Sequence, residues 1–164
     1  MSHPRDQKVK AGFALIITTD SRTEKEDDTG KSAISFLEAN EHKIISYSLI
    51  SNDSLKIRAE VERLLEDKSI NVLVTSGGTG LSNADKTVDA LVPIFQKQLP
   101  GFGEHFRRLS YDEVGGSAIM SRATGGIIDG KLIFCLPGSK NAVILALSKI
   151  ILPNLGHMLW EINR

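Results

Sequence analysis

The sequence predicts an α/β fold, a three-layer α/β/α sandwich around a mostly parallel mixed sheet. Short apolar segments typical of strands alternate with longer amphipathic segments typical of helices along the 164 residues. The pair Asp129-Gly130 lies between two apolar segments and predicts a two-residue hairpin, which requires at least one antiparallel strand. Residues 9–164 are long enough to bury the core of one domain, and residues 1–8 are predicted to form a flexible N-terminal tail.

The first half of the domain predicts two strands that are each followed by a helix. Residues 13–18 form an apolar strand, and after a polar loop Thr29 caps a helix that ends near residue 39. Residues 43–50 form the second strand, and the helix after it carries an apolar stripe on one face. The candidate N-caps of this second helix are Asn52, Asp53 and Ser54.

The second half predicts the remaining strands and the longest helix. Residues 70–74 are short, apolar and β-branched, as expected for a strand buried on both faces, and a helix over residues 87–96 follows. Ser139 caps a final helix that ends near residue 162. Between these helices the sequence predicts a turn at residues 100–103, helices at 104–111 and 117–123, and hairpin strands at 125–128 and 131–136.

The composition favours a cytoplasmic protein that binds neither nucleic acid nor membranes. The 20 Lys and Arg residues balance the 20 Asp and Glu residues, whereas nucleic-acid binders usually carry a basic excess. No apolar run reaches the roughly 18 residues that span a bilayer, and the N-terminus lacks the core of a signal peptide. Cys135 is the only cysteine and lies in an apolar run, so we expect a buried thiol and no intrachain disulfide.

A glycine-rich loop follows the strand at residues 70–74 directly. Residues 75–80, Thr-Ser-Gly-Gly-Thr-Gly, place three glycines within four positions. Because glycine lacks a Cβ, such a loop can adopt positive φ angles and bring backbone N–H groups close to an anion. Asp85, a carboxylate able to hold a metal, and a helix start at Thr87 come next. This combination predicts a nucleotide or phospho-ligand site.

Two further polar loops follow strand ends, one at Asp20 and one at residues 137–139. In open α/β sheets, ligands bind beyond the carboxyl ends of the strands. We therefore expect these two loops and the glycine-rich loop to converge on one rim of the sheet.

At this point the chain resembles the MoaB/MogA family of molybdenum-cofactor biosynthesis proteins, which also occurs as a domain of plant and animal cofactor-synthesis proteins. The resemblance covers residues 13–155 and rests on four blocks in the family's order. The blocks are residues 19–23 with 27–30, residues 75–89, residues 100–104 with 106–107, and residues 121–123 with 136–139. One glycine loop alone would be weak evidence, whereas four ordered blocks are highly specific.

The resemblance implies a molybdopterin-binding, MogA-like fold and a trimeric or hexameric homo-oligomer. In catalytic members the enzyme transfers AMP from Mg-ATP to the terminal phosphate of molybdopterin. The product is the form into which a downstream protein inserts molybdate or tungstate. Asp85 matches the family's catalytic aspartate and is the first candidate ligand of Mg²⁺, with Asp53 as the second.

The other binding candidates lie in the same four blocks and would contact ATP or molybdopterin. Backbone N–H groups of the glycine loop and of the turn at residues 137–139 would bind anions, and two arginines could bind phosphate in two-pronged fashion. These candidates are Asp20, Ser21, Arg22, Ser76, Gly77, Gly78, Thr79, Gly80, Ser121, Arg122, Pro137, Gly138 and Ser139.

Two departures from the family pattern keep an alternative open. Ala84 stands where catalytic members often have arginine, and Ser51-Asn52-Asp53 stands where members commonly have proline and an acidic pair. Either Asn52 or Asp53 is then the second functional position. These departures favour, as the alternative, a non-catalytic oligomeric molybdopterin carrier, and a hydrolase of nicotinamide or flavin nucleotides is a more distant option. Asp85 and Asp53 can each also be a helix N-cap and nothing more.

Overall fold

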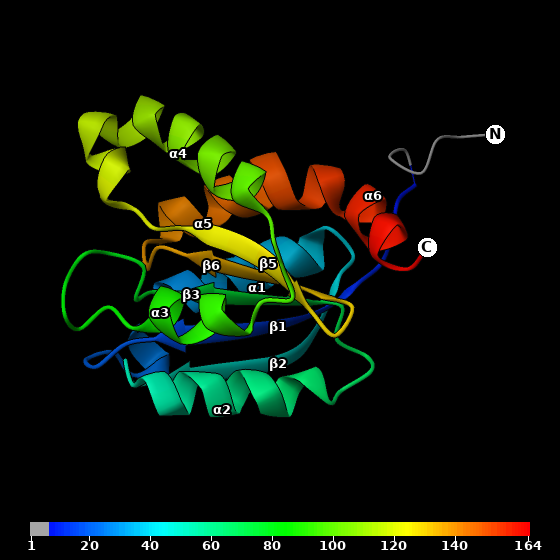
Figure 1. Cartoon of the computed structure of the whole chain (residues 1–164), viewed down its shortest axis with the longest axis horizontal. Coiled ribbons are helices and arrows are strands. Elements are labelled where there is room, and N and C mark those ends of the chain that lie inside the picture. The colour runs from blue at the N-terminus through cyan, green and yellow to red at the C-terminus, as the bar shows by residue number, and fades with distance from the viewer. Residues whose placement is uncertain (1–6) are drawn as a thin grey trace.

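The computed structural model describes residues 7–164 and contains one six-stranded sheet with helices on both faces (Figure 1). The strand order is β2-β1-β3-β6-β5-β4. The first four strands of this order are parallel, whereas β5 pairs antiparallel with both β6 and β4. The predicted three-layer sandwich with a mostly parallel mixed sheet is therefore confirmed. Of the predicted N-terminal tail, residues 1–6 lie outside the described residues.

The elements follow the alternation that the sequence predicts. The strands are β1 (Gly12–Thr18), β2 (Lys43–Ile50), β3 (Val72–Ser76), β4 (Lys97–Gln98), β5 (Thr124–Ile128) and β6 (Lys131–Leu136). The α-helices are α1 (Asp28–Ala39), α2 (Ser54–Leu65), α3 (Thr87–Leu91), α4 (Pro100–Val114), α5 (Lys140–Ala146) and α6 (Leu152–Ile162). Three 3₁₀ turns (Glu24–Glu26, Val92–Ile94 and Gly115–Met120) and a π-helical turn (Leu147–Ile151) complete the chain.

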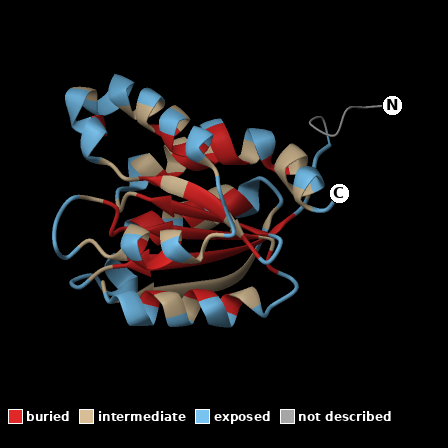
Figure 2. Ribbon diagram, viewed as in Figure 1, coloured by how far each residue is buried: buried red, intermediate tan, exposed pale blue. Residues whose placement is uncertain are grey.

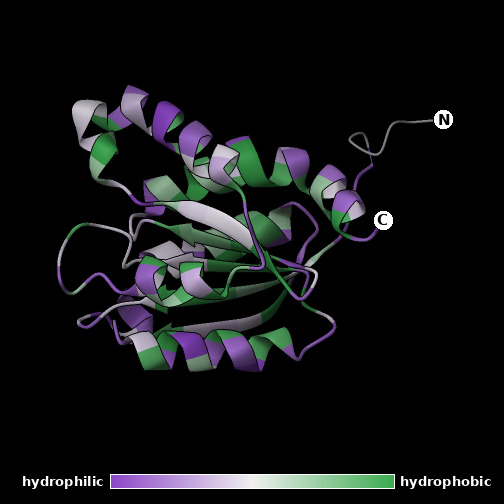
Figure 3. Cartoon of the chain, viewed as in Figure 1, coloured by the Kyte–Doolittle hydropathy of each residue, from purple (hydrophilic) through white to green (hydrophobic). Residues whose placement is uncertain are grey.

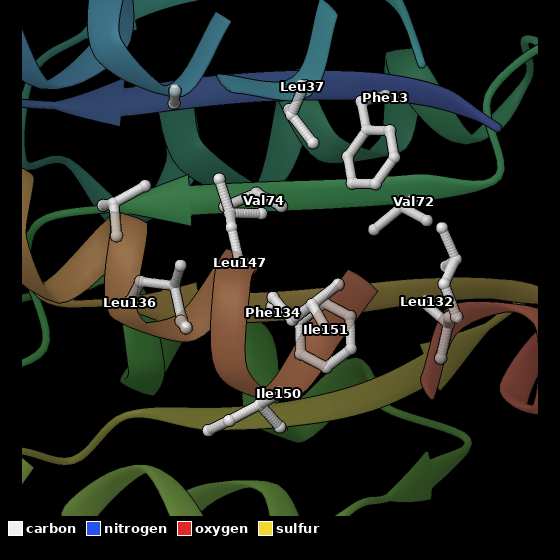
Figure 4. Packing of buried hydrophobic residues seen from close by; sticks show 14 of the residues in the cluster. Phe13, Leu37, Val72, Val74, Leu132, Phe134, Leu136, Leu147, Ile150 and Ile151 are labelled. Carbon is white, nitrogen blue, oxygen red and sulfur yellow. The ribbon is translucent and has the colours of Figure 1, made fainter. Parts of the chain in front are cut away.

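Two hydrophobic cores lie on opposite faces of the sheet because successive strand residues point to opposite sides. In β1, Phe13 and Leu15 belong to the core under α1, α4, α5 and α6, whereas Ala14 and Ile16 belong to the core under α2 and α3. Figure 2 shows the central strands buried, Figure 3 shows them hydrophobic, and Figure 4 shows the first core from close by. The buried central strands hold the loops at their ends in fixed positions.

The continuous helical segment Lys140–Ile162 covers the first core. Its 23 residues are long and apolar enough to cross a membrane by length and composition, and an 18-residue window within them has a mean hydropathy of 1.6. However, Val143, Leu147 and Ile151 are buried against the sheet, which is the expected pattern for a core helix (Figure 4). The π-helical turn lies just before Pro153, which has no N–H to donate to the preceding turn. The helix thus continues through the proline.

Three local predictions are wrong. Asp27, and not Thr29, caps α1: its Oδ1 accepts a hydrogen bond from Gly30 N at 3.0 Å. Residues 100–103 are not a turn but the first turn of α4, where proline is favoured. The helix predicted over residues 87–96 ends at Leu91, and the short edge strand β4 follows it.

The Asp27 cap also ties α1 to β2. Its carboxylate is fully buried, and Tyr47 of β2 donates its hydroxyl hydrogen to Oδ2 at 2.6 Å. Burial, and then the hydrogen bond to Asp27, raise the pKa of Tyr47 well above its usual range. The phenol therefore remains protonated, and a hydrogen-bond donor, at neutral pH.

We expect Tyr47→Phe to lower the free energy of unfolding by about 1.5–3 kcal/mol, because the buried carboxylate loses a hydrogen-bond donor. Because the folded pKa of Tyr47 is raised, this difference is fully present below about pH 10 and is lost only as pH rises through the folded pKa. Urea unfolding at several pH values measures it. Tyr111→Phe, at an exposed position on α4, is the control. Equal losses of unfolding free energy in the two variants would contradict the role of Tyr47 as a stabilising donor to Asp27.

Candidate functional site

The loops after β1, β3 and β6 converge on one rim of the sheet, at the left of Figure 1. Three hydrogen bonds join them. Thr18 Oγ1 donates to Ser76 O at 3.3 Å, Gly77 N donates to Leu136 O at 2.9 Å, and Ser76 Oγ donates to Pro137 O at 3.1 Å. These contacts place the glycine loop between its two neighbours, as the parallel strand ends predict.

The first two glycines of the loop have conformations that other residues rarely adopt. Gly77 has φ +105° and Gly78 has φ +69°. A Cβ on Gly77 would clash with the backbone oxygen of Thr18, and one on Gly78 would clash with Thr87 Oγ1. The tight turn therefore requires glycine at both positions, because of both the backbone angle and the surrounding atoms.

Three successive backbone carbonyls of the loop are bound by the chain itself. Gly78 O accepts from Thr87 N at 3.1 Å, and Thr79 O and Gly80 O accept from Arg122 N and Nε, both at 2.9 Å. In a planar trans peptide the N–H group points away from the carbonyl. The N–H groups of these three peptides belong to Thr79, Gly80 and Leu81, and none of them donates to another of residues 7–164. These three successive N–H groups, called the donor cradle below, have no acceptor within the described chain, and such backbone donors can bind anions.

Asp85 lies against this cradle, as the sequence predicts. Its Oδ2 is 2.7 Å from the place that a Cβ on Gly80 would occupy. The carboxylate accepts a hydrogen bond from Ser82 N at 3.1 Å and does not cap α3, whose N-cap is Lys86. The alternative that Asp85 is only a helix cap is therefore wrong. A surface pocket of about 260 Å³ opens beside it, lined by Leu81, Ser82, Asn83, Asp85, Lys86, Asp89 and Arg122.

Asp53 and Asp20 are engaged by neighbouring donors. Asp53 Oδ1 caps α2 by accepting from Leu55 N and Lys56 N, both at 2.9 Å, so its predicted role as a metal ligand has no support from this geometry. Asp20 accepts from Asn52 N at 2.8 Å and from Asn52 Nδ2 at 3.3 Å. Among the described residues, no group of three His, Cys, Asp or Glu side chains could hold a metal.

Asn52 links the Asp20 loop to the glycine loop. Its Oδ1 is buried without a hydrogen-bond partner among the residues that the structure describes, and it is 3.0 Å from the Cβ position of Gly78. Of the two candidates for the second functional position, Asn52 thus faces the glycine loop, whereas Asp53 faces the backbone of α2.

The turn after β6 is held from the first loop. Arg22 Nη1 and Thr29 Oγ1 both donate to Gly138 O, at 3.4 and 3.1 Å. Ser139 Oγ accepts from Ala142 N at 3.2 Å, so this hydroxyl caps α5 as predicted. Ser21 is exposed at the rim, and its N–H donates to Thr19 Oγ1.

The segment before β5 closes the other side of the glycine loop. The guanidinium of Arg122 donates to both carboxylate oxygens of Asp89, at 2.9 and 3.0 Å. This hydrogen bond holds the pKa of Asp89 below its usual range. Arg122 is thus not free for the two-pronged phosphate contact that the sequence predicts. Ser121 Oγ accepts from Ala123 N at 3.3 Å, which turns the chain toward β5.

The comparisons with known proteins agree with this geometry. Residues 14–157 match the family described as "Probable molybdopterin binding domain". The chain belongs to this family. It is 42% identical over 151 residues to Molybdenum cofactor biosynthesis protein B of Bacillus subtilis (strain 168), covering 92% of this chain and 89% of that protein.

Solved structures of MoaB proteins share the whole fold of this chain. A crystal structure of Molybdenum cofactor biosynthesis protein B has a TM-score of 0.92 and 38% identity, covering 97% of this chain and 99% of that one. The tungsten cofactor synthesizing protein MoaB from Pyrococcus furiosus has a TM-score of 0.86 and 34% identity, covering 94% and 98%. The predicted resemblance to MoaB and MogA is therefore confirmed.

Sequence reasoning brought together the right loops but missed two residues of this family member. Thr87 and Asp89 lie within the block at residues 75–89, yet the sequence indicated them only as part of a helix. Thr87 binds Gly78 O, and Asp89 fixes Arg122. The signal available for these two residues was that both lie in the block at residues 75–89, which carries the family resemblance.

We expect Gly78→Ala to weaken binding of inorganic pyrophosphate at least tenfold, because a Cβ there forces the loop out of its conformation. Left-handed backbone at a residue other than glycine also costs about 1–3 kcal/mol of stability. Isothermal titration calorimetry and urea unfolding measure the two effects. Gly116→Ala is the control, since a Cβ on Gly116 meets nothing within 4 Å. Wild-type affinity in Gly78→Ala would show that the loop conformation is not needed for the anion.

Proposed function

We propose that the chain acts in molybdenum cofactor biosynthesis as a Mg-ATP-dependent molybdopterin adenylyltransferase in the cytoplasm. The observation that carries the proposal is the donor cradle of Thr79, Gly80 and Leu81 with the Asp85 carboxylate beside it. Relatives named Molybdenum cofactor biosynthesis protein B support the pathway, and the site supports the type of reaction.

The proposed reaction brings two anions together. A terminal phosphate oxygen of molybdopterin forms a bond to the α-phosphorus of ATP. The bond from that phosphorus to the bridging oxygen of the β-phosphate breaks, and pyrophosphate leaves with the electron pair. The attacking oxygen is already ionised, so the step needs no base. The protein must therefore supply position and charge compensation. Backbone donors whose carbonyls are already bound do this with little reorganisation.

The residues fit a magnesium ion that arrives with the nucleotide. Mg²⁺ is commonly held by one or two carboxylates together with substrate phosphates. Among the described residues no cluster of three acidic, histidine or cysteine side chains offers a resident site. Asp85, which accepts a protein hydrogen bond at Oδ2 only, would hold the ion. When bound, Mg²⁺ would neutralise charge on the phosphates.

A molybdopterin carrier without chemistry is the second candidate. Ala84 is exposed at the place where catalytic family members often have arginine, so the loop lacks that cation, and Lys86 and Arg122 are the cations that line the pocket beside Asp85. Asn52 also places an uncharged side chain at the glycine loop. In a carrier, the same cradle would bind the molybdopterin phosphate and present it to the protein that inserts molybdate or tungstate.

We expect Asp85→Asn to lower the rate of AMP transfer well over tenfold, above about 1.4 kcal/mol of barrier, while molybdopterin binding survives. The substrates are molybdopterin, ATP and Mg²⁺, and the measurement is the amount of adenylylated molybdopterin. Asp129→Asn, the same change at the hairpin between β5 and β6 on the opposite edge, is the control. Unchanged turnover would remove Asp85 from the mechanism, and tight molybdopterin binding without product in wild type would favour the carrier.

A homo-oligomer, trimeric or hexameric, forms part of the proposal. Its observed support is a group of exposed apolar side chains on α4 and the 3₁₀ turn after it. Figure 1 shows this end of α4 projecting from the body of the molecule. The exposed apolar side chains are Tyr111, Val114, Ile119 and Met120. In the final helical segment, by contrast, Val143, Leu147 and Ile151 are buried against the sheet. The surface on α4 is therefore the better place for a second copy.

We expect Ile119→Asp to shift the protein from oligomer toward monomer, because a carboxylate would replace an apolar contact of a side chain that is 83% exposed in the single chain. Size-exclusion chromatography with light scattering measures the mass. Leu55→Asp, at an 80% exposed position on α2, is the matched control. An unchanged oligomer in Ile119→Asp would place the interface elsewhere.

A further inference from the structure

Asp89 of α3 and Arg122, two residues before β5, form an ion pair beside the glycine loop. Nη1 and Nη2 of the arginine donate to Oδ1 and Oδ2 of the aspartate, at 2.9 and 3.0 Å. The pair joins residues 33 positions apart, so it fixes two segments that the backbone does not hold together. Two parallel hydrogen bonds also fix the plane of the guanidinium.

Two other donors of Arg122 bind the loop. Its backbone N–H donates to Thr79 O and its Nε donates to Gly80 O, both at 2.9 Å. One residue thus holds two successive carbonyls of the loop, while Asp89 holds that residue in place. Thr87 N, on the first residue of α3, binds the third carbonyl.

The orientation of two carbonyls sets the orientation of two donors. Each peptide is planar and trans, so fixing Thr79 O and Gly80 O fixes the N–H groups of Gly80 and Leu81 on the opposite side. Glycine rotates more freely than other residues, so the peptides on either side of Gly80 would otherwise sample several orientations. Fixing them beforehand removes a cost that would be incurred when the anion binds.

We propose that Asp89 and Arg122 are positioning residues of the anion site, and that Asp89 acts through Arg122 to direct the N–H groups of Gly80 and Leu81 toward a phosphate-type ligand. The ligand class rests on the proposed function, whereas the positioning rests on the loop geometry alone. Arg122 thereby stabilises the shape of the site and does not itself contact phosphate.

The exposure of the ion pair distinguishes a positioning role from a purely stabilising one. The side chains of Asp89 and Arg122 are 57% and 33% exposed, and ion pairs in such positions contribute little to folding. A purely structural pair would therefore change neither stability nor binding much when broken. A positioning pair changes binding while stability stays nearly constant.

The two possible roles of Arg122 also predict opposite results for Asp89→Asn. If Arg122 contacted phosphate directly, removing the charge of Asp89 would release the guanidinium and raise the affinity for the anion. If the pair positions the loop, the same substitution loosens the loop and lowers the affinity.

The test is binding of inorganic pyrophosphate to the full chain by isothermal titration calorimetry. We expect Asp89→Asn to lower the affinity for pyrophosphate at least fivefold and Arg122→Gln to lower it at least tenfold. The double variant Asp89→Asn/Arg122→Gln should bind pyrophosphate no more weakly than Arg122→Gln alone. Asp89→Glu, which keeps the charge, should recover part of the loss. The urea midpoint should stay within error of wild type for Asp89→Asn. Glu60→Gln breaks the comparable two-pronged pair with Arg63 on α2 and is the control for loss of such a pair away from the loop.

Raised or unchanged affinity in Asp89→Asn, or additive losses in the double variant, would overturn the proposal. Failure of wild type to bind pyrophosphate would overturn it as well, because there would be no anion site to position. Pyrophosphate binding involves no AMP transfer, so a wild type that binds pyrophosphate but makes no adenylylated molybdopterin would contradict only the proposed enzyme function.

Discussion

The site depends on three successive carbonyls of the glycine loop that accept hydrogen bonds from the chain itself. Gly78 O, Thr79 O and Gly80 O are each bound by a residue from outside the loop, and the planarity of the peptide then decides where the amides point. The N–H groups of the site are therefore oriented by the carbonyls on the opposite side of the same peptides. The site consists of the buried strand β3, a turn that requires glycine, and the residues Thr87 and Arg122, which bind the carbonyls of that turn.

This arrangement would allow a chain with zero formal charge to bind the strongly anionic ligands of the proposed function. The arginines that the sequence indicates as phosphate contacts are used elsewhere: Arg22 reaches Gly138 O, and Arg122 reaches Asp89. Backbone amides carry the partial positive charge in their place, and their positions do not depend on flexible side chains. Affinity for an anion in such a site comes from a local field and not from the charge of the whole molecule.

The order of strands and helices could be predicted because hydrophobic periodicity is a local property. The rim could also be predicted, since parallel strand ends and polar loops coincide in the sequence. The cap of α1 could not, because Tyr47 lies 20 residues from Asp27 in the sequence and supplies a tertiary hydrogen bond. Nor could β4, whose two residues are too short for any alternation. The pair of Asp89 and Arg122 was hidden because its partners belong to different blocks.

The single thiol of the chain lies close to this rim. Cys135 is fully buried on β6, one residue before the Leu136 carbonyl that binds Gly77 N, and burial raises the pKa of the thiol to about 12. A thiol reagent reaches it only after the strand separates from its neighbours, so the labelling rate reports the local opening of β6. The native sequence thus contains its own reporter of how firmly the strand behind the site is held, without any engineered label.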